Sequence, residues 1–281
     1  MLRESLPVIP RRNLVLLCAV PALLAGSLAC WLAFDQEAVS WAIRSEMNPH
    51  ASLWARTLTL LGKGWLQVWL LLVWFTVSHR RREVLSGILA LILVGATVGP
   101  LKIVVGRARP YAVARAQETG RPERDRRHDV SFPSGDTAGA FAVGGAVVPA
   151  LGWPLRAVFL GCGAVIGGLR VMGLAHYPSD VLAGIAIGLL AAWLAIRMID
   201  RWGHADRPVP YEGWLVWGGI IGVPIGVGVS DGIGDLLFFL GTYGTLVLSV
   251  LLVTCIGDLR RKAVSRSVLP LLARIRRIVM P

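Results

Sequence analysis

Long apolar runs separated by charged connections constrain this chain more than any other feature of its sequence. The chain has 281 residues, 55% of them hydrophobic, and its mean hydropathy is +0.63. Runs of about twenty apolar residues recur along it, and each is long enough to cross the hydrocarbon core of a bilayer as a helix. A soluble protein of this length would need more polar surface. We therefore predict an all-α integral membrane protein.

The apolar runs predict eight membrane spans. They cover about 14–34, 58–78, 84–105, 137–152, 155–174, 179–199, 214–229 and 236–256. The chain then divides into residues 1–200 with six spans, 201–257 with two extra spans, and a basic tail at 258–281. The tail alternates basic and apolar residues, so it is either an interfacial helix on the inner leaflet or a disordered basic segment.

The start of the chain and its cysteines indicate no processing and no metal. The first apolar run is longer than the hydrophobic region of a typical signal peptide and lacks a clear cleavage site, so we expect it to be retained. All four cysteines fall inside apolar runs, where we interpret them as packing residues without a disulfide or metal pattern. They are Cys18, Cys30, Cys162 and Cys255.

The formal net charge of +12 resides mainly in the connections between apolar runs. This placement fits anionic headgroups and control of topology, so we expect a lipid bilayer and no nucleic acid as partner. With the N-terminus in the cytoplasm, most connecting cations lie inside. The arginine-rich loop at 106–131 then lies outside, against the positive-inside rule, unless its cations bind an anion. The composition also suggests a bacterial inner membrane, with the loop facing the periplasm or exterior.

Three polar clusters fall at span ends on this same outer side. They are Lys102 with Arg109 and Pro110, the segment Pro133, Ser134, Gly135 and Asp136, and the stretch with Arg170, His176 and Asp180. Arginine can fork onto phosphate oxygens, and histidine can attack or move protons near neutral pH. Pro178 suits the first turn of a helix, from which Asp180 can reach back to His176. Structural alternatives are a snorkelling Lys102 and a helix cap at Ser134 or Asp136.

In order and spacing, these clusters resemble the type 2 phosphatidic acid phosphatase (PAP2) superfamily of membrane lipid phosphatases. The family pattern is Lys-x6-Arg-Pro, then Pro-Ser-Gly-His, then Ser-Arg-x5-His-x3-Asp. The resemblance covers about residues 84–199 and has two departures: Asp136 stands in place of histidine, and Leu169 in place of serine. It implies a six-helix transmembrane bundle, to which this chain adds two C-terminal helices.

The resemblance also implies a metal-independent phosphohistidine mechanism without a cofactor. His176 would attack phosphorus and Asp180 would orient it, while Lys102, Arg109 and Arg170 would bind the phosphate oxygens. Ser134 and the backbone around Gly135, at a helix N-terminus, also suit an anion. The implied activity is hydrolysis of a phosphate or diphosphate on a membrane lipid, of the phosphatidate, polyprenyl diphosphate or lipid A type.

Asp136 raises the question of the proton donor, because an ionised carboxylate cannot protonate a leaving group. Three alternatives stay open at this point. Asp136 retains a proton beside the bound phosphate, His128 in the loop replaces it, or the substrate has a leaving group that needs little protonation. The last alternative favours a polyprenyl diphosphate or an anomeric phosphate, as in lipid A, over phosphatidate.

Two other classes of function share these residues. A phosphotransferase would pass the phosphoryl group from His176 to a lipid or sugar acceptor, and the sequence does not separate that acceptor from water. A degenerate protein could bind lipid phosphate without hydrolysis, although a mere binder would not need the pair His176 and Asp180. An ion channel fits least, because the polar groups gather at one membrane face.

Overall fold

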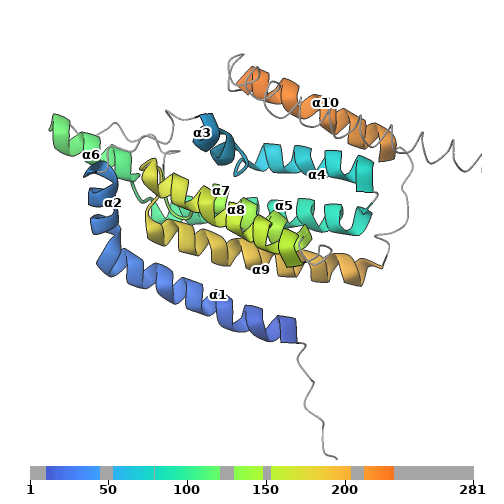
Figure 1. Cartoon of the computed structure of the whole chain (residues 1–281), viewed down its shortest axis with the longest axis horizontal. Helices are drawn as coiled ribbons and strands as arrows, with labels where there is room; N and C mark the ends of the chain where they lie inside the picture. Colours follow the sequence, from blue (N-terminus) through green and yellow to red (C-terminus); the bar gives the residue numbers. More distant parts are fainter. Residues whose placement is uncertain are drawn as a thin grey trace, which may run out of the picture. The chain divides into compact units, whose positions relative to one another are not determined.

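The computed structural model describes residues 11–44, 53–78, 80–120, 130–147, 153–203 and 212–230. Within these ranges the regular structure is helical, and the one bridge between extended residues is an isolated antiparallel pair, Ala108 with Val130. The α-helices, labelled in Figure 1, are α1 (Arg11–Ala29), α2 (Asp35–Arg44), α3 (Leu53–Leu60), α4 (Gly64–Ser78), α5 (Arg81–Val105), α6 (Pro110–Thr119), α7 (Gly135–Val147), α8 (Trp153–Met172), α9 (Pro178–Trp202) and α10 (Glu212–Ser230). A short π-helix, η1 (Cys30–Phe34), joins α1 to α2.

Within the described ranges, three helical segments are long and apolar enough to cross a membrane: Cys18–Arg44, Arg81–Val105 and Pro178–Trp202. The last two coincide with the predicted third and sixth spans. Two further apolar helices, Gly64–Thr76 and Ala157–Met172, are shorter. The all-helical class is therefore confirmed for the described residues, whereas the count of eight spans is not. The eighth predicted span, the basic tail and His128 lie outside the described residues.

Three boundaries differ from the prediction. The first span does not end near residue 34, because the helix continues through η1 and α2 to Arg44. The second apolar run is broken between α3 and α4, where Gly62 and Gly64 flank Lys63, and glycine disfavours helix interiors. The polar loop contains a further helix, α6, which begins with Pro110 at a position that proline favours.

The chain forms two compact units, residues 1–72 with 80–212 and residues 73–79 with 213–281. In the first unit α7 and α9 pack against each other and both contact α5, while α1 packs on α9 and α8 on α7 (Figure 1). The shared core consists of small and β-branched side chains: Ala90, Val94, Val98, Ala138, Ala142, Ala191 and Ala195. Small residues permit the close helix contacts that stabilise membrane bundles.

The contact between α7 and α9 depends on glycine. A methyl group on Gly184 would lie 2.6 Å from the carbonyl oxygen of Ser134, and one on Gly167 would lie 2.7 Å from Val181 Cγ1. Because the backbone at Ser134 cannot move away cheaply, Gly184 brings α9 directly against the start of α7. Gly167 in turn lets the end of α8 approach the Val181 side chain of α9. The ends of three helices therefore meet in one place.

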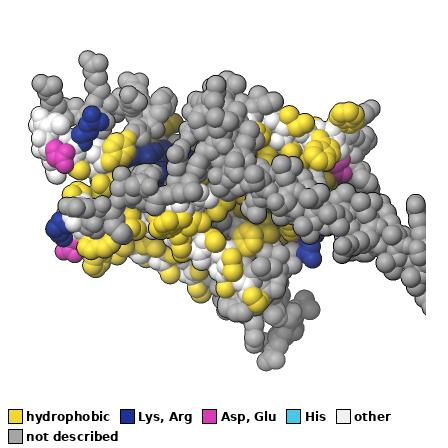
Figure 2. Space-filling view, turned by 45° about the horizontal axis from the view of Figure 1, so that its top comes forward, with side chains coloured by type: hydrophobic (Ala, Val, Ile, Leu, Met, Phe, Trp, Pro, Cys, Tyr) yellow, Lys and Arg dark blue, Asp and Glu magenta, His cyan; other side chains and the backbone are white. Residues whose placement is uncertain are grey.

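Large hydrophobic side chains remain exposed on the outer helices, as expected of a surface in contact with lipid. Examples are Leu28 and Leu32 near the N-terminus and Leu190, Leu194 and Met198 on α9. Figure 2 shows such side chains spread over the described part of one face, with few charged groups among them. α10, in the second unit, likewise exposes Trp214, Leu215 and Trp217.

Candidate functional site

The three predicted polar clusters lie together at one end of the first unit. α5 and α8 end there, and α7 and α9 begin there. Gly106 closes α5 in the left-handed conformation with φ of +58°, which glycine adopts without the penalty of a Cβ atom. The chain then turns back, and Arg107 and Ala108 pair with Val130 and Ser131 just before α7. This pairing joins the arginine loop to the segment with Ser134.

A tight turn at the end of α8 places His176 beside Arg170. The backbone N–H groups of Ala175 and His176 both donate to the carbonyl of Arg170, at 3.0 and 3.2 Å. Leu174 in this turn has φ of +52°, a strained conformation for a branched side chain. Such strain costs about 1–3 kcal/mol and is concentrated at functional sites. The turn thus fixes the imidazole at the buried junction of α8 and α9.

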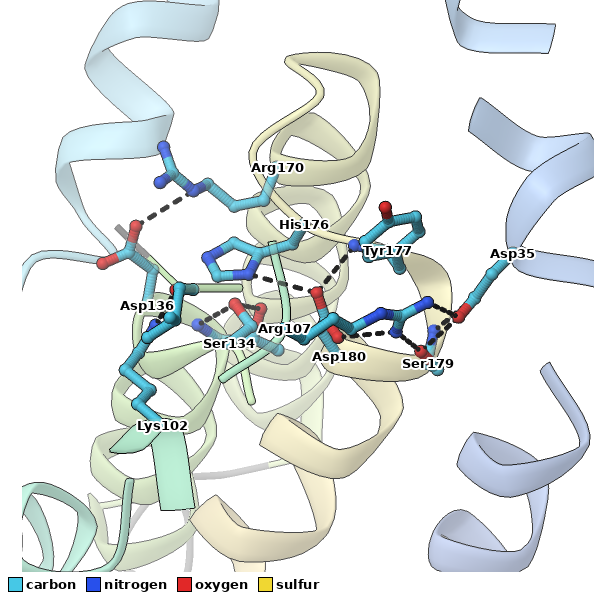
Figure 3. Close-up of polar contacts among 12 residues, drawn as sticks. Asp35, Lys102, Arg107, Ser134, Asp136, Arg170, His176, Tyr177, Ser179 and Asp180 are labelled. Atoms are coloured by element: carbon cyan, nitrogen blue, oxygen red, sulfur yellow. Dashed lines mark hydrogen bonds and ion pairs between the residues drawn. The ribbon is translucent and has the colours of Figure 1, made fainter. Parts of the chain in front are cut away.

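His176 and Asp180 form the predicted pair, one helical turn apart. His176 Nδ1 lies 3.5 Å from Asp180 Oδ2, and both side chains are buried. The same carboxylate oxygen accepts the N–H of Tyr177 at 2.8 Å, which fixes it across the first turn of α9. In Figure 3 the opposite edge of the ring faces Asp136. Nε2 is therefore the ring nitrogen turned away from Asp180.

Burial keeps the imidazole of His176 neutral. Desolvation lowers the pKa of His176, and the nearby cations Arg170 and Lys102 lower it further, while the close contact with Asp180 and its charge act in the opposite direction. The net direction is downward. A histidine held unprotonated at neutral pH can act as a nucleophile.

The three predicted phosphate-binding cations converge on this site. Lys102 lies within electrostatic reach of Arg109 and Arg170, and Arg170 within reach of Arg109. Lys102 Nζ donates to the carbonyl of Val130 at 2.6 Å, which ties the end of α5 to the loop before α7. Like charges repel, so three cations in one partly buried place favour the binding of an anion.

Asp136 does not stand alone at the start of α7. Its Oδ2 lies 3.1 Å from Arg170 Nε and 4.0 Å from Lys63 Nζ (Figure 3 shows the pair with Arg170). Asp136 thus forms ion-pair contacts with Arg170 and Lys63. Lys63, in the turn between α3 and α4, was not identified from the sequence. Its position between two glycines in a break of an apolar run was the available signal.

Ser134 and Gly135 occupy the N-terminus of α7 as predicted, but their contacts differ. Ser134 is fully buried, its Oγ lies 2.9 Å from Thr137 Oγ1, and its N–H donates to the carbonyl of Asp180 at 3.0 Å. The structural alternative of a cap at Ser134 matches these contacts. Gly135 is half-buried, and a methyl group on it would lie 3.6 Å from Val98 Cγ1, an ordinary contact. Packing therefore does not require glycine there.

A second buried network adjoins Asp180 and was missed in the sequence. Arg107 donates to Asp180 Oδ1 at 3.1 Å and to Asp35 Oδ2 at 2.7 Å (Figure 3). Asp35 is 1% exposed and lies 72 positions before Arg107 in the chain. A carboxylate directly after an apolar run was the available signal, because such a charge is costly without a partner.

The side chains of the site carry a net positive charge that a bound phosphate could neutralise. Five cations (Lys63, Lys102, Arg107, Arg109 and Arg170) face three carboxylates (Asp35, Asp136 and Asp180), so two positive charges are in excess with His176 neutral. A phosphate monoester carries about −1.5 to −2 charges at pH 7. In the described part of the chain no three His, Cys, Asp or Glu side chains gather in a metal-binding group.

Comparison with known proteins agrees with the resemblance drawn from the motifs. Residues 83–204 match the family model of the PAP2 superfamily. A lipid A 1-phosphatase of Rhizobium johnstonii is 36% identical over 118 residues, which are 41% of this chain and 46% of that protein. One of Rhizobium etli is also 36% identical over 118 residues, 41% of this chain and 49% of that protein.

These matches span about half the length of the relatives. Among solved structures, the crystal structure of Aquifex aeolicus LpxE is similar at 24% identity and a TM-score of 0.48. The alignment covers 59% of this chain and 96% of that one.

Leu169, where the family pattern has serine, is buried in α8.

Proposed function

From the PAP2 superfamily region at residues 83–204, we propose that this chain is a membrane lipid phosphatase acting through a phosphohistidine at His176. The substrate we favour carries its phosphate on an anomeric sugar carbon, as in the lipid A 1-phosphate class. Two observations support this choice. Relatives at 36% identity are lipid A 1-phosphatases, and the position of the family histidine holds Asp136.

In the proposed reaction Nε2 of His176 attacks phosphorus in line, and the bond from phosphorus to the lipid oxygen breaks. Water then attacks the phosphohistidine, which releases inorganic phosphate and returns a free imidazole. Asp180 holds the ring and stabilises its positive charge in both steps, as the acid does in a catalytic triad. Lys102, Arg109 and Arg170 stabilise the charge on the transferred phosphoryl oxygens without a metal ion.

Asp136 bears on the leaving group. Its Oδ2 forms ion-pair contacts with Arg170 Nε and Lys63 Nζ, and we propose that Asp136 does not protonate the leaving group. A lipid alkoxide is strongly basic and would need a proton, whereas the oxygen of an anomeric carbon or of a diphosphate is a weaker base. The ion pair therefore favours the third of the alternatives for Asp136, a substrate that leaves with little protonation.

The contact between His176 and Asp180, placed among three cations, is the observation on which the proposal rests. Phosphate release from a panel of lipids by the purified full chain in detergent tests it. We expect lipid A to be hydrolysed faster than undecaprenyl diphosphate, and both faster than phosphatidate. His176→Ala should lower the rate at least about 10³-fold. Faster turnover of phosphatidate would contradict the substrate assignment, and an active His176→Ala would contradict the mechanism.

We further propose that the site faces the periplasm or exterior of an inner membrane, because this orientation places most connecting cations in the cytoplasm. A single cysteine introduced at Thr119, the last residue of α6, tests the orientation in a cysteine-free background. Membrane-impermeant thiol reagents should label it in intact cells whose outer membrane has been permeabilised. Labelling only after lysis would reverse the orientation.

A further inference from the structure

The N-terminal helices contribute a buried carboxylate to the surroundings of Asp180. Asp35, the first residue of α2, accepts the N–H of Ser179 at 3.1 Å and the hydroxyl of Ser179 at 2.5 Å. Ser27 of α1 donates to the carbonyl of Ser179 at 2.8 Å. Asp35 thus caps the start of α9 from another part of the chain, outside the region that matches the family.

Arg107 connects this carboxylate to Asp180. One guanidinium nitrogen donates to Asp35, while the other donates to both Ser179 and Asp180 (Figure 3). Its guanidinium carbon also lies 4.1 Å from the ring centre of Trp31 and 3.6 Å from that of Tyr177. The two ring contacts and three polar partners together hold the guanidinium of Arg107 in a single orientation.

The two oxygens of Asp180 then have separate partners. Oδ2 faces His176 and accepts from Tyr177, while Oδ1 accepts from Arg107. Rotation of the carboxylate away from the imidazole would break both sets of contacts. Asp35 in turn balances the charge of Arg107, so that Arg107 does not neutralise Asp180 alone.

We propose that Asp35 and Trp31 are positioning residues of the active site, which act through Arg107 on the orientation and charge of Asp180 and hence on His176. The catalytic meaning of this inference rests on the proposed function. A buried ion network is a poor way to gain stability, because apolar residues of equal volume usually do as well or better. A functional constraint on Asp180 accounts for the network.

The charge of Asp35 should affect how readily His176 binds a proton, and this can be measured. His176 is faced by Asp180 from α9, Arg170 from α8, Lys102 from α5 and, across the site, Asp136 from α7. Removal of the Asp35 charge leaves Arg107 to offset Asp180 alone, which lowers the negative potential at the imidazole. The Asp35→Asn variant should therefore bind a proton at His176 less readily than the wild type.

The test uses the full chain in detergent, with ¹⁵N-labelled histidine followed by NMR and assigned with His176→Gln. In Asp35→Asn we expect the pKa of His176 to fall and, on lipid A, kcat to drop about 10–100-fold with KM unchanged, the range found for groups that orient active-site ligands. Asp200→Asn, at the far end of α9, is the control and should change neither value. An unchanged titration of His176 in folded Asp35→Asn would overturn the inference.

A second variant covers the case in which Asp35→Asn does not fold. Ser179→Ala removes one bridge between Arg107 and Asp35 and keeps every charge, so we expect a smaller loss of kcat with KM unchanged. Wild-type kcat in Ser179→Ala would overturn the inference. The NMR titration needs no substrate, so it separates the two proposals. A shifted pKa in a protein without phosphatase activity would retain the positioning role and refute the proposed function.

Discussion

Two arginine–aspartate ion pairs connect the α5 region to α9, one at each end of α9. The two pairs differ in how far they are exposed to water. Arg82 contacts Asp200 at 2.5–2.7 Å, with the side chains 43% and 34% exposed. Arg107 contacts Asp180 at 3.1 Å, with the side chains 12% and 0% exposed. Water screens the first pair, which is worth at most about 1 kcal/mol. The second pair is buried, and removing its two charges from water costs free energy. This cost indicates that the pair has a role other than stabilising the fold.

Substitution of the two aspartates should separate the pairs most widely. We expect Asp180→Asn to lower kcat on the order of 10⁴-fold, because an amide neither fixes the imidazole tautomer nor stabilises its charge. Asp200→Asn should leave kcat within about twofold, as for an exposed ion pair. Phosphate release from lipid A by the two purified variants measures both values. Equal losses would remove the distinction between the two ends.

Removal of the two arginines should separate the pairs in stability. Arg107→Met leaves Asp35 and Asp180 buried without their shared cation, so we expect the free energy of unfolding to fall by about 3–5 kcal/mol. Arg82→Met should cost less than about 1 kcal/mol. Unfolding in mixed micelles with increasing dodecyl sulfate, followed by circular dichroism, provides the comparison. A similar small cost for both would mean that water reaches Arg107.

Two glycines at the site end should respond in opposite ways. Gly184→Ala places a methyl group 2.6 Å from the carbonyl of Ser134, and such overpacking costs about 1–3 kcal/mol of stability. Gly135→Ala meets only an ordinary 3.6 Å contact with Val98, so stability should hold. If the backbone at Gly135 contacts the phosphate as proposed, kcat/KM should fall, because a Cβ atom hinders that close approach. An unchanged kcat/KM in Gly135→Ala would contradict a role of Gly135 in binding the phosphate.

The smallest effect concerns pH. The pKa of His176 is lower in the folded protein than its ordinary value of about 6.5, so kcat/KM should stay level as pH falls to about 6.5 and decline only below it. The unfolded chain binds this proton more readily than the folded one. Stability therefore decreases as pH falls below about 6.5 towards the folded-state pKa, with no contribution from His176 above that window. His176→Gln should lose this part of the pH dependence, and an acid limb above pH 6.5 would contradict the lowered pKa.

The sequence predicted which polar residues lie together at one end of the helices better than it predicted where the helices begin and end. Lys102, Arg170, His176 and Asp180 share one end because span ends alternate between membrane faces, a rule that depends only on chain order. The break at Lys63 and the continuation through Asp35 were missed, since apolar periodicity does not report where a helix turns or ends. Asp35 and Arg107 are 72 positions apart, and no local pattern links them. Such long-range contacts follow from packing alone.

We propose that the imidazole of His176 accepts the phosphoryl group, and a trapping experiment can detect this intermediate. The purified chain is mixed with lipid A, stopped within the first turnover at alkaline pH, where phosphohistidine survives, and digested for mass spectrometry. We expect one phosphoryl group on the peptide with His176, and none in His176→Ala. Continued phosphate release in His176→Ala, or a phosphoryl group on any other residue of the wild type, would contradict it.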